Sequence, residues 1–158
     1  MRKEKAIKYF RQTTFYSCGP ACLRMMLPAF GLEATESELI NICGTSSFGT
    51  TCEQILQAAQ LIGLTGETFK IRTVAELDKI LQKRKPIIAL IDAAVLYGGP
   101  PLAGHFVVIL KAKGDEFVYH DPVMGPSRTV AKELFLKAWQ VFNLRGVRLW
   151  KPRKSAKK

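Results

Sequence analysis

The spacing of apolar and polar residues along the chain predicts helices first and strands afterwards. Apolar residues recur at helical spacing from Ala21 to Ala29, and this first helix is expected to end between Pro28 and Gly31. The run Thr35-Glu36-Ser37-Glu38 is a capping box, in which the first and fourth side chains bond free N–H groups at the start of a helix. A short second helix is therefore predicted after Thr35.

Two more helices are predicted from the same kind of start signal. Thr50 to Glu53 has the capping pattern and opens an apolar-periodic segment that stops at Gly63. A short extended run lies around Thr68 to Ile71, and Thr73 to Glu76 then begins a helix that reaches about Lys83. The N-terminal half of the chain is thus predicted to be mainly helical.

After Pro86 the pattern becomes that of strands. The predicted C-terminal elements are a strand buried on both faces over Ile87 to Ile91, an irregular loop from Ala93 to Gly104, strands over His105 to Leu110 and Glu116 to His120 with a turn at Lys113 to Asp115, a helix over Val130 to Trp139 and a closing strand over Val141 to Trp150. Helices gather in one half and antiparallel strands in the other. The predicted fold class is therefore α+β, with N-terminal helices packed on a C-terminal antiparallel sheet.

Length and composition indicate one globular domain over residues 1–158. Of the 158 residues, 47% are apolar, which is enough for a well-formed core. No apolar run approaches the roughly 18 residues that a membrane-spanning helix needs. No apolar segment of a secretory signal follows the charged start Met1 to Lys5. The protein is therefore expected in the cytoplasm, where its cysteines would stay reduced.

The net charge of +11 is concentrated in two short basic arms. Residues 1–11 carry +4 and residues 151–158 carry +5, so residues 12–150 carry only +2. Aromatic residues are not interleaved with the basic ones as a stacking surface for nucleic acid would require, so nucleic acid is not an expected partner. The arms could contact an acidic partner or the anionic cytoplasmic face of a membrane, or could simply be solvated.

The cysteine and histidine spacings do not predict a metal site. The four cysteines are Cys18, Cys22, Cys43 and Cys52, and the two histidines are His105 and His120. These residues form no C-x-x-C pair and lack the paired ligand spacing of a zinc finger. No metal ion or other cofactor is expected.

Cys18 stands out because it lies where a polar loop turns into the first helix. The N-terminus of a helix carries partial positive charge and free N–H groups, and both favour the thiolate over the thiol. Pro20 fits there because the first helical turn leaves its N–H groups without intrahelical partners. Six residues upstream, Gln12 offers a side-chain amide that could donate to an oxyanion. Taken alone, Cys18 is better explained as a small buried apolar residue.

His105 and Asp121 are the candidates for completing a site around Cys18. If they face each other across two antiparallel strands, the turn must be centred on residue 113, and Lys113 opens the predicted turn. Strand side chains alternate, so Asp121 shares a face with Tyr119, whereas His120 points to the other face. Each residue singly is better explained by a structural role, and only their joint arrangement favours a site.

These residues together resemble a known family. The run Gln12-x5-Cys18-Gly19-Pro20-Ala21, then Gly104-His105-Phe106-Val107-Val108, then Asp121-Pro122 with Gly125 is similar to the C39 peptidases, which are papain-like cysteine proteases. The resemblance extends from about Ala6 to Trp150. It implies a papain-like fold, Cys18 as nucleophile, His105 as general acid/base, Asp121 as the residue that orients His105, and Gln12 in the oxyanion hole.

The resemblance also implies a substrate class. The best-known C39 domains belong to bacteriocin and peptide exporters and cut leader peptides after a Gly-Gly pair, so a leader peptide and a peptide exporter are implied partners. Ser17 departs from those exporter domains, which usually carry Asp before the cysteine. Two alternatives stay open. One is a non-catalytic peptide-binding module on the same fold. The other is an amide hydrolase or acyltransferase that uses the same residues on a non-peptide substrate.

Overall fold

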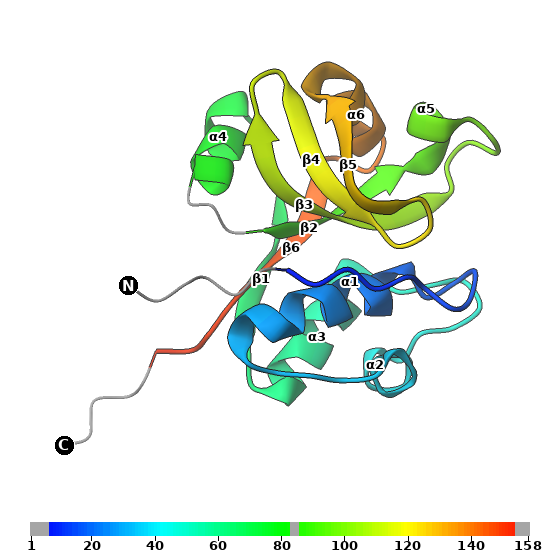
Figure 1. The fold of residues 1–158 in the computed structure, drawn as a ribbon, viewed down its shortest axis with the longest axis vertical. Helices are drawn as coiled ribbons and strands as arrows, with labels where there is room; N and C mark the ends of the chain where they lie inside the picture. The colour runs from blue at the N-terminus through cyan, green and yellow to red at the C-terminus, as the bar shows by residue number, and fades with distance from the viewer. Residues whose placement is uncertain (1–6, 83–85, 154–158) are drawn as a thin grey trace.

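The centre of the computed structural model is a six-stranded antiparallel sheet (Figure 1). The structure describes residues 7–82 and 86–153; the ends of the basic arms and Lys83 lie outside the described residues. In the order of pairing, the strands are β1 (Thr65–Lys70), β6 (Arg145–Trp150), β2 (Ile87–Asp92), β3 (Gly104–Lys113), β4 (Glu116–Asp121) and β5 (Gly125–Ala131). The prediction of an antiparallel sheet in an α+β fold is confirmed.

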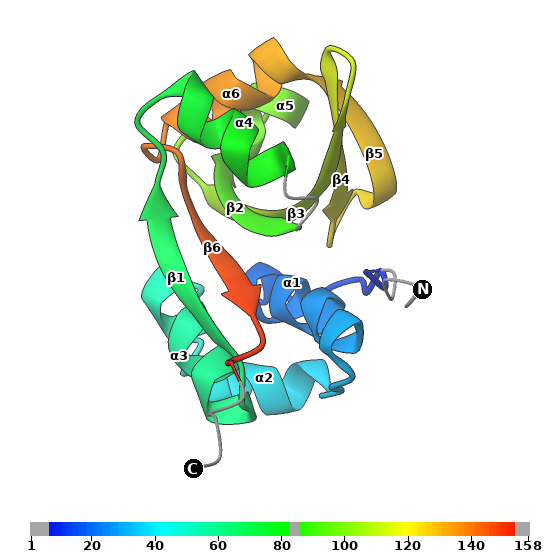
Figure 2. The ribbon, with the colours of Figure 1, turned by 90° about the vertical axis from the view of Figure 1, so that its left-hand side faces the viewer.

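Helices cover both faces of the sheet (Figures 1 and 2). One layer holds α1 (Cys18–Met26), a 3-10 helix (Leu27–Phe30), α2 (Glu36–Cys43) and α3 (Cys52–Ile62), and the other holds α4 (Val74–Gln82), α5 (Ala93–Tyr97) and α6 (Lys132–Gln140). Contacts join α1 to β3 and α3 to β1 and β6, whereas α6 packs on β2, β4 and β5. Among the helices that the structure describes, none is both long and apolar enough to cross a membrane.

The sheet separates two hydrophobic clusters because strand side chains alternate between its faces. On β3, Phe106 and Val108 pack with the buried residues of α1, α2 and α3. Val107 and Ile109 alternate with these two residues along the strand and lie on the opposite face of the sheet. There they pack with α6 around the fully buried Trp139. The strand β3 is therefore buried on both faces, with helices packed on either side of it.

The helix starts differ from prediction by one to three residues. The first helix begins at Cys18 and not at Ala21, and its 3-10 extension ends at Gly31 with the left-handed φ of +75° that glycine favours. The third helix is capped by Thr51 with Gln54 as the reciprocal partner, not by the predicted Thr50 with Glu53. The Thr50 hydroxyl lies 2.8 Å from that of Thr45 instead, so it does not cap the helix.

Two elements were not predicted. Part of the expected loop after β2 is the five-residue helix α5, which Asp92 caps by accepting from the N–H of Ala94 at 3.0 Å; such a helix is too short to show a period. The strand β5 lies at the sheet edge with none of its residues buried, and its start, Gly125-Pro126-Ser127, has the composition of a loop. The helix expected from Val130 begins at Lys132. The closing strand begins at Arg145 and not at Val141, since a turn with left-handed residues precedes it.

The hairpin between β3 and β4 has a different register from the prediction. The pairs are Val108 with His120 and Lys113 with Glu116, so the turn consists of residues 114–115 and the register shifts near residue 110. Continued to the end of β4, this register puts Asp121 level with residue 107, two positions from His105. The prediction that His105 faces Asp121 directly across the hairpin is therefore wrong. Residues 105 and 107 share one face, which leaves His105 and Asp121 as diagonal neighbours.

At Gly146, β6 passes close to its neighbours. A Cβ atom at this position would lie 2.3 Å from the main-chain oxygen of Ile88 and 2.6 Å from the ring of Phe69. We expect Gly146→Ala to lower the free energy of unfolding by about 2 kcal/mol or more, because the strand must shift to relieve the overlap. Denaturant titration measures the change. The neighbouring exposed Arg145→Ala is the control and should change stability by less than about 0.5 kcal/mol; equal stability of both variants would contradict this account.

Candidate active site

Cys18 is the first residue of α1 and lies at the interface of the helical layer with the sheet. Its side chain is nearly buried, with 9% exposed, and the first N–H groups of the helix have no intrahelical partner. The preceding Ser17 is fully buried, and its hydroxyl accepts from the N–H of Thr14 at 3.2 Å and lies 2.7 Å from the Thr14 hydroxyl. These bonds fold the loop back on itself and fix where the helix begins.

The structure brings His105 and Asp121 into direct contact at the end of the β3–β4 hairpin. Nε2 of His105 lies 2.8 Å from Oδ1 of Asp121, whose carboxylate is fully buried. The same oxygen accepts from the N–H groups of Val123 at 2.9 Å and Met124 at 3.1 Å. A buried charge is costly unless it is hydrogen-bonded, and these donors satisfy one of its two oxygens.

The electrostatics of the pair favour an ionised carboxylate beside a protonated ring. Burial alone would raise the pKa of Asp121, but the hydrogen bond and charge of His105 outweigh burial and hold that pKa below its usual value. Burial lowers the pKa of His105, but hydrogen bonds to Asp121 and Cys18 outweigh it and raise the pKa to about 9. The stability that the protonated ring contributes is thus fully present below pH 6.5 and is lost as the pH rises through about 9.

The two ring nitrogens of His105 have different partners. Asp121 engages Nε2, and a neutral ring donates that proton because an ionised carboxylate can only accept. Nδ1 is then left for the thiol of Cys18, which is among the groups that raise the pKa of the ring. A histidine bonded in this way can take the thiol proton and become the imidazolium partner of a thiolate.

Gln12 lies beside the turn that follows Asp121. Its main-chain N–H donates to the carbonyl of Pro122 at 2.9 Å, and Nε2 of its side chain donates to the carbonyl of Thr14 at 2.7 Å. Its Oε1 atom is buried without a hydrogen-bond partner among the described residues. One N–H of the amide is used by Thr14, so the second remains for another acceptor.

Glu36 was not predicted to take part in the site, yet it anchors the loop between Gln12 and Cys18. Both carboxylate oxygens of this buried residue accept from the N–H of Thr13 at 3.1 Å, and the Thr13 hydroxyl also bonds it. Glu38 completes the capping box of α2, which leaves Glu36 free for this contact. The capping sequence located both carboxylates on the first helical turn, but only the fold shows which loop Glu36 holds.

Tyr97 was also not predicted to take part in the site, yet its hydroxyl donates to Oδ2 of Asp121 at 2.8 Å. It comes from α5, the helix that was expected to be loop, so no pattern in the sequence pointed to it. Strand alternation did place Tyr119 on the face of Asp121, and its hydroxyl lies 2.6 Å from that of Tyr97. Asp121 therefore has partners on both of its oxygens.

His120 lies apart from these residues, as alternation predicts. Its Nδ1 accepts from the N–H of Ser127 at 3.0 Å, its Nε2 lies 3.4 Å from the carbonyl of Ile7, and its ring meets Tyr9 edge to face. Burial lowers the pKa of His120. Each contact has a structural role in joining β4, β5 and the N-terminal segment.

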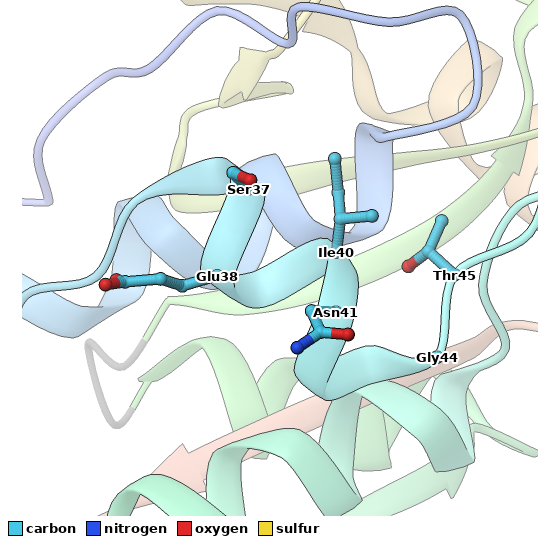
Figure 3. A pocket seen from close by; sticks show the side chains of 6 residues that line it. All are labelled: Ser37, Glu38, Ile40, Asn41, Gly44 and Thr45. Atoms are coloured by element: carbon cyan, nitrogen blue, oxygen red, sulfur yellow. The ribbon is translucent and has the colours of Figure 1, made fainter.

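Within residues 7–82 and 86–153, no three His, Cys, Asp or Glu side chains are grouped as a metal ion would need. A surface hollow on α2 and the segment after it does not coincide with the site either (Figure 3); its lining residues are Ser37, Glu38, Ile40, Asn41, Gly44 and Thr45. The chemistry available around Cys18 is therefore that of a thiol, an imidazole, a carboxylate and an amide.

Two comparisons with known sequences bear on this arrangement. Residues 6–145 match the model of the Peptidase C39 family. The chain is 33% identical over 122 residues to the lactococcin-G-processing and transport ATP-binding protein LagD of Lactococcus lactis, covering 77% of this chain but only 16% of that protein. It is 31% identical over 127 residues to an uncharacterized protein of Methanothermobacter marburgensis, covering 80% of this chain and 79% of that protein.

Solved structures share the fold. The peptidase domain of Streptococcus ComA, a bifunctional ABC transporter, superposes with a TM-score of 0.76 at 22% identity, over 92% of this chain and 99% of that one. A double glycine motif protease from an AMS/PCAT transporter, solved with the leader peptide, gives a TM-score of 0.74 at 21% identity, over 96% of each chain. Since the family model spans nearly the whole sequence and the fold agrees, the chain belongs to the Peptidase C39 family of cysteine peptidases.

Proposed function

We propose that this protein is a cysteine peptidase that cleaves a leader peptide after a Gly-Gly pair. The observation that carries the proposal is the buried pair of His105 and Asp121, bonded through Nε2. Cys18, at a helix N-terminus, is near enough to this pair to be among the groups that raise the pKa of His105. The proposal treats residues 1–158 as one peptidase domain with basic arms at 1–11 and 151–158.

The proposed reaction has two halves. The thiolate of Cys18 attacks the carbonyl carbon of the scissile peptide bond, and the His105 imidazolium gives its proton to the departing amine, which leaves a thioester on Cys18. Water then attacks the thioester while His105 takes its proton, and the acid product leaves with the thiolate restored. Asp121 keeps the ring oriented through both halves. The free N–H of Cys18 and the second amide N–H of Gln12 are proposed to hold the oxyanion.

The substrate class is supported by what similar proteins are called. LagD is named as a processing and transport protein, and the double glycine motif protease was solved with a leader peptide. By analogy we infer that the partners are a leader peptide and a peptide exporter, and that the reaction takes place at the cytoplasmic face of a membrane. The basic arms are then a candidate contact with the anionic lipid surface.

The first prediction concerns which thiol reacts. We expect iodoacetamide at about pH 6, well below the free-thiol pKa of roughly 8.5, to modify Cys18 before the other cysteines. Burial raises the pKa of Cys43 and of Cys52 to about 11 and that of Cys22 well above its usual value, so these thiols should stay unreactive. Peptide mapping by mass spectrometry measures the order, with Cys18→Ser as the control. Faster labelling of Cys43 or Cys52 would contradict the assignment.

The second prediction separates the two histidines. His105→Ala should lower kcat by about a thousandfold, because thiolate activation and protonation of the leaving amine are lost together. His120→Ala should keep its turnover and lose a little stability, since its contacts lie with Ser127 and Tyr9 away from Cys18. Both variants are assayed side by side on one soluble peptide and by thermal unfolding. Turnover retained in His105→Ala and lost in His120→Ala would exclude the proposed site.

The third prediction tests the substrate. A peptide carrying Gly-Gly before the cut should be hydrolysed, and replacing either glycine by Leu should abolish cleavage, because the proposed specificity admits no side chain at either position. Liquid chromatography with mass spectrometry identifies the cut, and Cys18→Ala is the matched inactive control. Equal rates on the Leu peptides would indicate a general peptidase. Binding of the Gly-Gly peptide without hydrolysis would instead favour a peptide-binding module.

A further inference from the structure

Two tyrosine hydroxyls lie in series on the side of Asp121 that faces away from His105. The Tyr97 hydroxyl donates to Oδ2 of Asp121 at 2.8 Å, and the Tyr119 hydroxyl lies 2.6 Å from the oxygen of Tyr97. Tyr119 is almost fully buried, and Tyr97 is half-buried. The two hydroxyls thus form an unbroken chain of hydrogen bonds that ends on the carboxylate.

The direction of each hydrogen bond follows from the number of protons. The carboxylate of Asp121 is ionised and can only accept, so the single hydroxyl proton of Tyr97 must point at Oδ2. The oxygen of Tyr97 can then only accept, so Tyr119 donates to it. All the donors point toward Asp121, and Oδ1 is left to His105 and the two N–H groups of the turn.

The outer end of this chain is held by the strand β5. Arg128 on β5 pairs with Tyr119 on β4, and its guanidinium lies over the ring of Tyr97, 5.6 Å from the ring centroid. The same side chain donates through Nη1 to the carbonyl of Met124 at 3.2 Å, in the turn whose N–H groups bond Asp121. A positive group therefore lies beside both tyrosines and the turn.

We propose that Tyr97, supported by Tyr119, is a positioning residue that fixes the carboxylate of Asp121 so that Oδ1 stays directed at His105. The inference rests on the proposed function, in which His105 serves Cys18. A carboxylate with a single oxygen bonded can rotate about its terminal torsion, which is broad and roughly two-fold. With Tyr97 on Oδ2 and three donors on Oδ1, that torsion is fixed.

Tyr97 also limits how strongly Asp121 attracts the proton of His105. Each donor shares the negative charge of the carboxylate, so removing one strengthens the bond to the donors that remain. The pKa of His105 should therefore rise when Tyr97 loses its hydroxyl. Titratable or charged groups also surround the pair of His105 and Asp121. They are Cys18 and Cys22 on α1, Tyr9 and Arg11 on the N-terminal segment, Tyr97 on α5, Tyr119 on β4 and Arg128 on β5. None of the others changes in this substitution.

The test is Tyr97→Phe in the full chain, followed by two pH profiles. On a soluble Gly-Gly peptide, we expect kcat to fall about tenfold with KM unchanged. In the profile of kcat against pH, the alkaline limb, where His105 loses its proton, should move up by roughly 0.5 to 1 pH unit. The rate of Cys18 alkylation by iodoacetamide should show the same upward shift of its upper inflection, and this second profile needs no peptide cleavage.

Tyr9→Phe is the matched control. Its hydroxyl also bonds Asp121, at 2.8 Å, but through the main-chain carbonyl and not the carboxylate. Tyr9→Phe removes this one bond, whereas Tyr97→Phe removes the bond to Oδ2 and the bond from Tyr119. A purely structural role therefore predicts a loss of stability in both variants and no shift of either pH profile. We expect the limb to move only in Tyr97→Phe. Unshifted profiles in that variant would overturn the proposal.

Tyr119→Phe provides an independent test. It should shift the limb in the same direction by less, and the double variant with Tyr97→Phe should equal Tyr97→Phe alone, because Tyr119 acts only through Tyr97. Additive shifts of the two single variants in the double variant would overturn the series arrangement. If no peptide is cleaved, the proposed function fails, and the alkylation profile alone decides: a shifted inflection supports the role of Tyr97 and an unshifted one excludes it.

Discussion

The buried carboxylate of Asp121 is the interaction on which the rest of the site depends. An unpaired charge in this environment would cost several kcal/mol, so its oxygens must be satisfied by donors from the fold. Those donors come from β3 through His105, from the β4–β5 turn through its N–H groups, and from α5 through Tyr97. The main-chain carbonyl also accepts from Tyr9. The charge therefore joins three segments of the chain, and the main chain of the same residue joins a fourth.

Cys18 reaches this arrangement because the helical layer packs on the sheet beside it. Phe106 and Val108 hold α1 against β3, and the loop before α1 is anchored by Glu36. Gly19 allows the segment around Thr50 to approach closely, since a Cβ atom there would lie 3.1 Å from Thr50 Cβ. Cys18 is thus positioned by apolar packing, and His105 by its buried pairing with Asp121.

The departure from the usual exporter sequence has a local structural counterpart. Ser17, where those domains usually carry Asp, is fully buried and bonds Thr14 through its hydroxyl. A neutral hydroxyl meets its hydrogen-bonding needs within the loop, whereas a buried carboxylate at this position would require further donors. The contacts of Ser17 concern the shape of the loop and leave the pairing of His105 with Asp121 untouched.

The sequence by itself determined the fold class, the order of most elements and the family, because these depend on local periodicity, capping residues and short motifs around Cys18, His105 and Asp121. Alternation also placed Tyr119 on the correct face. Only the tertiary structure decided the hairpin register, since a shift near residue 110 leaves no mark in the sequence. It alone decided the partners of Glu36 and Tyr97, because those contacts join residues far apart in the chain through packing that no local pattern encodes.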